Sequence, residues 1–328
     1  MIFEVGKEPT IAENINNYLL PAENIFIWSR TKPLSNVPKI NIGNKPIDNG
    51  NYIFTDEGKT EFLNKEPQAA PYFHPYYGAD EFINNKPRWI LWLGDCKTSE
   101  LTQLPECQKR IKAVKEFRLT RGAETRELAE RPTHFHVENM PKSNYLLIPR
   151  HSSENRDYIP MGFMSPENLA SDATLIAPGA TLYHFGVLQS RIHMAWVNFV
   201  CGRIKSDFRY SSRVVYNCFP WPEDITDDQR EAIERSAQSI LDARQEDPEA
   251  TLADYYDDHS NCMSDDLRNA HDENNLAVAA AFGFSKNDTE YDIALELMRR
   301  STKIAQKLDK PKKKKRSSKV NKNKCEKR

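Results

Sequence analysis

TLYHFGVLQSRIHMAWVNFVCGRIKSDFRYSSRVVYNCFPWP, residues 181–222, joins two different hydrophobic periodicities. Between Phe185 and Val200 apolar residues recur at steps of three and four, which predicts a mostly buried helix that Gly202 is well placed to end. The residues that follow alternate as in a strand. One side of this strand carries the polar residues Lys205, Asp207, Arg209 and Ser211. The final FPWP closes the unit, because two prolines cannot continue a central strand.

The sequence before this stretch consists of short apolar runs separated by turn-forming residues. Two of the runs, Trp89–Leu93 and Tyr145–Ile148, predict strands, and a third, Leu175–Ala177, leads into the central stretch. Residues 105–131 predict an amphipathic helix, and residues 56–65 a short helix. This mixture of strands and helices indicates a mixed α/β (α+β) fold.

The composition changes after Pro222. Between Glu223 and Glu273 there are seventeen acidic residues against four arginines. Thr226, followed by helix-forming residues, predicts a capped helix that continues to Ala243. Further helices are expected at Leu252–Tyr256, Leu267–Ala281 and Tyr291–Leu308. We therefore expect a small helical domain with an acidic surface.

The totals describe a globular chain with a basic end. With 328 residues, 39% apolar and 28% charged, the chain is long enough for two domains. The formal net charge is −1, yet residues 307–328 carry twelve Lys or Arg against two acids, and we expect this low-complexity tail to be disordered. No run of about eighteen apolar residues and no signal-peptide pattern occurs, which predicts a cytoplasmic protein without a membrane span. Six dispersed cysteines predict reduced thiols and no zinc site.

Motifs of common catalytic sites are missing from the sequence. There is no glycine-rich phosphate loop, no H-E-x-x-H, no G-x-S-x-G and no kinase motif set. His134 and His136 lack nearby Cys or Asp partners, so an exposed strand pair is the preferred interpretation over a metal site. His184 and His193 are expected to be structural. We therefore predict no catalytic residue, no metal site and no cofactor in this chain.

Seven blocks of the sequence follow one another in a characteristic order. They are KPLSNVPKINIGNKPIDNG (32–50), EFINNKPRWILWL (81–93), YLLIPRHSSENRDYIPMGF (145–163), ASDATLIAP (170–178), LYHFGVLQSRIHMAW (182–196), GRIKSDFRYSSRVVYNCFPWP (202–222) and LADYYD (252–257). In this order they resemble the C-terminal half of MmeI-like enzymes, and the resemblance runs from about residue 29 to residue 308. Members of this family are single-chain restriction–modification proteins with a nuclease, an adenine-N6 DNA methyltransferase, a target-recognition domain and a C-terminal helical domain.

The resemblance implies a domain plan in which the chemistry lies elsewhere. Residues 1–29 would be a remnant or linker from a missing methyltransferase domain, 30–222 a DNA target-recognition domain, 223–308 the helical domain and 309–328 the disordered tail. S-adenosylmethionine and Mg²⁺ would belong to the missing domains. The chain would then be a truncated gene product or a split subunit that binds double-stranded DNA beside a separately encoded methyltransferase and nuclease half.

The resemblance also implies which residues select bases. The family's specificity positions fall on Arg150, Asp172, Ala173, Lys205, Asp207 and Arg209. The chemistry of these side chains agrees, since Lys and Arg donate to guanine in the major groove and Asp accepts from cytosine N4. Lys205 with Asp207 could read one G·C pair, and Arg150 with Asp172 another. The alternative is that Lys205 and Asp207 form an exposed ion pair worth about 0–1 kcal/mol.

Contacts to the DNA backbone would come from other basic residues. The candidates are Lys109, Arg191, Arg203 and Arg213, together with the basic side of the 105–131 helix, where Arg118 lies. Solvated surface is an equally good interpretation of each. The lysine-rich tail would add salt-sensitive, non-specific affinity.

Two functions of different kinds are consistent with the sequence. The preferred one is sequence-specific recognition of duplex DNA for an adenine-N6 methyltransferase or restriction enzyme. The alternative is a degenerate, non-catalytic remnant whose acidic helical domain contacts a protein partner. A remnant would show no preference among DNA sequences, which separates the two.

Overall fold

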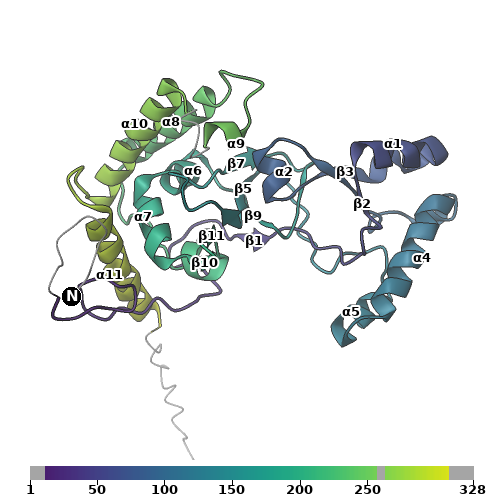
Figure 1. Cartoon of the computed structure of the whole chain (residues 1–328), viewed down its shortest axis with the longest axis horizontal. Coiled ribbons are helices and arrows are strands. Elements are labelled where there is room, and N and C mark those ends of the chain that lie inside the picture. Colours follow the sequence, from purple (N-terminus) through teal and green to yellow (C-terminus); the bar gives the residue numbers. More distant parts are fainter. Residues whose placement is uncertain (1–11, 257–262, 310–328) are drawn as a thin grey trace, which may run out of the picture.

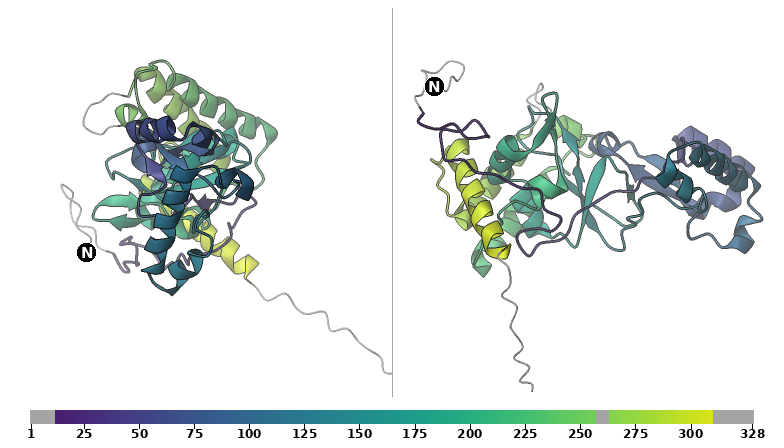
Figure 2. Two further views of the ribbon diagram at one scale, coloured as in Figure 1. Left: turned by 90° about the vertical axis from the view of Figure 1, so that its right-hand side faces the viewer. Right: turned by 90° about the horizontal axis from the view of Figure 1, so that it is seen from below.

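The fold consists of two lobes of mixed sheet and helix, with a layer of long helices against the larger lobe. The computed structural model describes residues 12–256 and 263–309. Figure 1 shows the smaller lobe as an arm that extends from the larger lobe, on the side opposite the long helices. The view from below in Figure 2 shows the same order. The mixed α/β architecture with added helices is confirmed. Across the described ranges, no helix is long and apolar enough to cross a membrane.

The smaller lobe is built on a four-stranded sheet with the order β2-β4-β3-β8. Its core contains Phe54, Phe62 and Phe73, whose rings meet edge to face with centroids 5.1, 5.4 and 5.5 Å apart. The single helix predicted over residues 105–131 is wrong, because the chain leaves the helix at residues 120–122 and starts a second one. The elements of this lobe are β2 Ile53–Phe54, α1 Asp56–Lys65, η1 Pro67–Tyr72, β3 Phe73–Tyr77, α2 Ala79–Ile83, β4 Arg88–Leu91, α3 Thr98–Leu101, α4 Pro105–Leu119, α5 Ala123–Leu128 and β8 Leu169–Ala170.

The larger lobe is built on a second four-stranded sheet with the order β1-β9-β5-β7. Its central strand β5 is apolar throughout, and all five of its residues are buried, as expected for a strand covered on both faces. The predicted strands at Tyr145–Ile148 and Leu175–Ala177 are confirmed as β5 and β9. The strands are β1 Asn41–Ile42, β5 Tyr145–Pro149, β7 Gly162–Met164 and β9 Thr174–Pro178.

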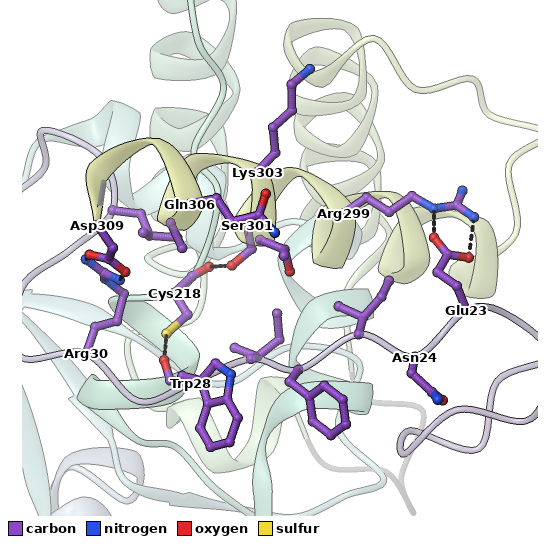
Figure 3. Close-up of a pocket in the computed structure, with 16 residues that line it drawn as sticks. Glu23, Asn24, Trp28, Arg30, Cys218, Arg299, Ser301, Lys303, Gln306 and Asp309 are labelled. Atoms are coloured by element: carbon purple, nitrogen blue, oxygen red, sulfur yellow. Dashed lines mark hydrogen bonds and ion pairs between the residues drawn. The ribbon is translucent and has the colours of Figure 1, made fainter. Parts of the chain in front are cut away.

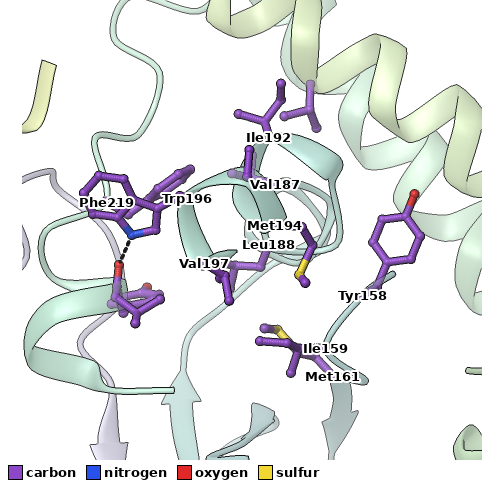
Figure 4. Packing of buried hydrophobic residues seen from close by; sticks show 14 of the residues in the cluster. Tyr158, Ile159, Met161, Val187, Leu188, Ile192, Met194, Trp196, Val197 and Phe219 are labelled. Atoms are coloured by element: carbon purple, nitrogen blue, oxygen red, sulfur yellow. Dashed lines mark hydrogen bonds between the residues drawn. The ribbon is translucent and has the colours of Figure 1, made fainter. Parts of the chain in front are cut away.

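The stretch from 181 to 200 forms two helices rather than the one predicted. They are α6 (Leu182–Leu188) and α7 (Arg191–Val200). The break falls at Gln189, whose buried side chain donates to the Ile159 carbonyl at 2.6 Å, and Ser190 caps α7 through its hydroxyl. The apolar spacing continues across the break because both helices enter one core. Figure 4 shows side chains of α6 and α7 packed between Phe219 and the 158–161 segment.

A layer of three long helices covers the larger lobe. The capped helix expected from Thr226 is confirmed as α8, where Thr226 and Gln229 form a capping box. This helix packs against α6 at Gly186, where a Cβ would lie 2.7 Å from the side chain of Ile233. This close approach leaves room only for glycine at position 186. Buried side chains of α6 and α8 belong to one hydrophobic core. The helices of this part are α8 Asp227–Ala243, α9 Leu252–Tyr255, α10 Asp265–Phe282 and α11 Glu290–Leu308. The lysine-rich tail lies outside the described residues, apart from Asp309.

The N-terminal segment lies along α11 and is fixed there by two arginine–carboxylate pairs. Arg299 donates to Glu23 at 2.7 and 2.9 Å, and Arg30 donates to Asp309 at 2.8 and 3.0 Å. A cavity of about 610 Å³ lies between the segment and the helix (Figure 3). Residues 23 and 30 therefore lie beside the middle and the end of α11.

Two buried histidines make the stability of this fold depend on pH. His193 bonds to the Tyr210 hydroxyl at 2.9 Å and His271 to the Tyr256 hydroxyl at 2.7 Å, and burial lowers the pKa of each to about 3. Between the ordinary pKa of about 6.5 and pH 3, the unfolded chain therefore binds protons that the folded chain does not.

We expect the free energy of unfolding to fall as the pH is lowered from 7 to 5. Each histidine should contribute about 1.4 kcal/mol per pH unit below its unfolded pKa. Urea denaturation across this range should show a shallower slope for His271→Gln than for the unchanged chain. Equal slopes for the two proteins would contradict the assignment.

Candidate functional site

A two-stranded hairpin after α7 carries three of the residues predicted to select bases. β10 (Gly202–Ile204) pairs antiparallel with β11 (Asp207–Arg209), and Lys205 and Ser206 form the turn between them. Lys205 has a φ of 56°, in the left-handed region. The continuous strand predicted to carry Lys205, Asp207 and Arg209 on one side is therefore wrong. Lys205 lies at the tip, and only Asp207 and Arg209 share a strand face.

Alternating burial along β11 leaves its charged side chains free to contact a ligand. Phe208 is buried, whereas Asp207 and Arg209 on either side of it are exposed. The Arg203 guanidinium lies 4.4 Å from the centre of the Phe208 ring, donates to the Ser206 carbonyl at 2.7 Å and pairs with a nearby glutamate. Arg203, predicted as a phosphate contact, thus braces the hairpin, although it remains exposed.

The short strand β6 (His151–Ser152) joins the hairpin to the larger lobe. It pairs with β11 so that His151 faces Arg209, and the amide of Tyr210 donates to the Arg150 carbonyl at 2.8 Å. The sheet order β10-β11-β6 therefore brings Arg150 beside the base of the hairpin. These contacts connect residues that are about sixty positions apart in the sequence.

The turn of residues 171–173, between β8 and β9, carries Asp172 and Ala173. The Arg150 side chain donates to the Asp172 carbonyl at 2.7 Å, and the backbone amide of Arg150 donates to the Ala173 carbonyl at 3.1 Å. The Asp172 carboxylate lies 3.7 Å from the ammonium group of Lys45, and both side chains are partly exposed. Five of the six predicted base-selecting residues thus lie on directly contacting segments, and Lys205 lies at the tip of the same hairpin.

Two residues of this site were not found from the sequence. His151 is exposed and lies near Arg150, Arg209 and Asp207, and its pKa is lowered by partial burial and by the two arginines, with Asp207 acting in the opposite direction. Lys45 comes from a segment about 125 residues before Asp172. No local pattern marks Lys45, whereas His151 directly follows Arg150 at the end of a predicted strand.

The remaining phosphate-contact candidates do not gather at one place. Lys109 on α4 pairs with Glu106 at 2.6 Å, and Arg191 at the start of α7 donates to the Asp288 carbonyl at 3.3 Å. Arg213 is exposed, in a different segment, η2 (Ser212–Tyr216). Arg118, expected on the basic side of its helix, is fully buried. The prediction for Arg118 is wrong because its guanidinium has carbonyl partners inside the protein.

The histidines have structural partners. His134 pairs with Glu138 at 2.9 Å and His136 lies 3.7 Å from Glu124, in an irregular, half-buried segment rather than the exposed strand predicted. His184 lies at the N-terminus of α6, bonded to Thr181, and His193 lies in the core, which confirms their structural interpretation. Among the described residues, no group of three or more His, Cys, Asp or Glu could hold a metal ion.

Comparisons with known proteins match nearly the whole chain. A family model of the MmeI target recognition domain matches residues 21–223, and a model of the MmeI C-terminal domain matches residues 225–308. DNA methyltransferase A of Bacillus subtilis (strain 168) is 36% identical over 302 residues, which cover 91% of this chain and 34% of that protein. A solved structure of the type IIL restriction-modification enzyme MmeI in complex with DNA superposes with a TM-score of 0.86 at 41% identity, covering 90% of this chain and 39% of that one. The chain thus spans between a third and two-fifths of the length of these relatives.

Proposed function

Because this chain belongs to the MmeI target recognition domain family and also carries the MmeI C-terminal domain, we propose that it recognises a specific sequence in double-stranded DNA. The observation that carries the proposal is that the partly exposed residues Arg150 and Asp172 lie beside the exposed β10–β11 hairpin. Base edges are distinguished in the major groove by arrays of donors and acceptors, and a two-stranded ribbon fits that groove. The similarity to a protein solved in complex with DNA supports the same function.

The surface offers both kinds of hydrogen-bonding group that a G·C pair requires. Lys205 and Arg209 carry donors suited to guanine O6 and N7, and the Asp207 carboxylate between them accepts from cytosine N4. At the base of the hairpin, Arg150 and Asp172 offer a second donor and acceptor. Ala173 adds a small apolar contact of the kind that can meet a thymine methyl group. Lys109, Arg191, Arg203 and Arg213 stay proposals for phosphate contacts, and of these Arg203 lies on the hairpin.

Selection from a pool of randomised duplexes tests the proposal. The full chain should enrich one short motif, and the double variant Lys205→Asn with Asp207→Asn should lose preference at one base position, worth roughly 1–3 kcal/mol of discrimination. Asparagine tolerates the left-handed backbone at residue 205, so the hairpin should keep its shape. General affinity should change little.

The control for this experiment is Lys112→Ala, which removes an exposed lysine of the smaller lobe. It should leave every position of the motif intact. An unchanged motif in the double variant would reject the base-reading role of the hairpin.

We propose further that methyl transfer and DNA cleavage depend on protein sequence outside these 328 residues, which would hold S-adenosylmethionine and Mg²⁺. The chain matches only part of a relative named a methyltransferase and part of one named a restriction-modification enzyme. A methyl-transfer assay with tritiated S-adenosylmethionine should give no turnover with this chain alone. Turnover by the purified chain would reject this division of labour.

A second function, docking of a protein partner, is favoured by the N-terminal segment. Leu19, Phe26 and Trp28 are 77, 53 and 76% exposed, and the last two rings stack with centroids 6.0 Å apart. Exposed apolar groups that lie together mark interaction surfaces. If partner docking were the only function, the randomised selection would return no motif.

A further inference from the structure

A strap of residues 43–45 lies directly against the turn that carries Asp172 and Ala173. Asn44 is fully buried and pairs with Ser171 in an isolated parallel bridge. Its backbone amide and its side-chain amide both donate to the Ala170 carbonyl, at 2.7 and 3.1 Å. Gly43 donates to the Thr174 carbonyl at 3.1 Å. The strap and the turn therefore behave as one rigid unit.

The far side of the strap is fixed as firmly as the near side. The Asn44 side-chain oxygen accepts from the amide of Asn139 at 2.8 Å, and its carbonyl accepts from the Tyr76 hydroxyl at 2.8 Å. Lys45 bridges to Val137, with its amide donating to the Val137 carbonyl at 3.0 Å. The backbone of Lys45 is therefore held in place, while its side chain is 46% exposed and reaches toward Asp172.

We propose that Lys45 is a further specificity-determining residue, which reads one G·C pair together with Asp172. The inference rests on the proposed function of the chain as a DNA-recognition module. Lys45 would donate to guanine and Asp172 would accept from cytosine N4 of the same pair. The Arg150 guanidinium donates one hydrogen bond to the Asp172 carbonyl. Its other N–H groups would then be available to a neighbouring base or a phosphate.

The geometry favours this role over a simple surface ion pair. The Lys45 ammonium lies 3.7 Å from the Asp172 carboxylate, which is longer than a hydrogen bond, and both groups keep a partly exposed surface. Such a pair adds little to stability. A donor and an acceptor on rigid backbone, a few ångströms apart and both accessible, match the spacing of groups across a base pair. They also lie beside Arg150, which the hairpin contacts.

Selection from randomised duplexes with the full chain and its Lys45→Ala variant tests the inference. The unchanged chain should enrich a motif, and Lys45→Ala should lose roughly fivefold to a hundredfold of the preference at one base pair. Asp172→Asn should weaken the same position, and the double variant should be no worse there than the more affected single variant. Lys45→Arg should retain the guanine preference, which shows that the fold is intact.

Lys97→Ala is the matched control, because Lys97 forms an ion pair of the same 3.7 Å length with Glu100 on the smaller lobe. It should leave the motif unchanged. An unchanged motif with Lys45→Ala, or an equal loss of affinity for all sequences, would overturn the inference and leave the proposed function intact. Absence of any motif with the unchanged chain would instead reject the proposed function itself.

Discussion

Replacing Arg118 by methionine should lower the free energy of unfolding by about 3–5 kcal/mol. The guanidinium is fully buried and donates to six backbone carbonyls on two segments, 46–47 and 128–134. The shortest of these bonds, both 2.8 Å, join it to Pro46 and His134. Methionine fills most of the volume but removes the donor from the carbonyls of Pro46, Ile47 and His134, and each unpaired buried group costs about 1–3 kcal/mol. The other three carbonyls keep a second donor, from the Arg131 amide, the His134 amide and the Tyr52 hydroxyl. Lysine should restore little, because its single ammonium group cannot reach carbonyls on opposite sides.

Urea denaturation, followed by fluorescence, measures this effect, and Arg121→Met provides the control. Arg121 lies one turn further along the chain and is exposed, with its guanidinium 4.2 Å from the centre of the Phe117 ring. Its substitution should change stability by less than about 1 kcal/mol. If the two variants were equally stable, the carbonyl cluster would not be what holds the 46–47 and 128–134 segments to α4.

Replacing Gly43 by alanine should disturb DNA recognition, although residue 43 is not itself proposed to contact DNA. A Cβ at this position would lie 2.2 Å from the Ser171 carbonyl oxygen and 2.6 Å from that of Ala170, and both of these are backbone atoms. The strap must therefore separate from the turn, at a cost of about 1–3 kcal/mol. Because Asp172 and Ala173 lie on that turn, the preference at the base positions that they are proposed to read should be lost.

The preference at the base positions that the hairpin is proposed to read should survive in this variant, because β6 and β11 are paired independently of Gly43. Randomised-duplex selection, together with denaturation, separates the two effects. Gly122→Ala is the matched control, since a Cβ there would meet no atom within 4 Å. A Gly43→Ala variant with the complete motif would show that the turn does not depend on the strap.

The sequence was most informative where local physics decides the structure. The capped helix from Thr226 to Ala243 and the apolar strand at Tyr145 follow from side-chain chemistry within a few residues. The break between α6 and α7 could not be predicted, because it depends on a bond from Gln189 to a carbonyl thirty residues away. The same limit applies to Arg118, which resembles a solvated arginine until its carbonyl partners are known.

The candidate site was predicted unevenly for a related reason. The hairpin turn was missed because Lys205 and its successor are not the Asn-Gly type that favours a left-handed backbone, so the alternation was extended through the turn. The family resemblance, rather than periodicity, supplied Arg150 and Asp172. Lys45 could not be found, since its relation to Asp172 is created by the strap and by long-range pairing.

The two arginine–carboxylate pairs between the N-terminal segment and α11 have a consequence for engineering. Arg30 is in direct contact with Asp309, and Glu23 with Arg299, so residues 23–30 and the C-terminal half of α11 lie side by side. A module with adjacent entry and exit can be grafted into a host protein as an insertion, because the host has only a small gap to bridge. A DNA-recognition module could then be inserted into another protein as a unit, with the two arginine–carboxylate pairs holding its two ends together.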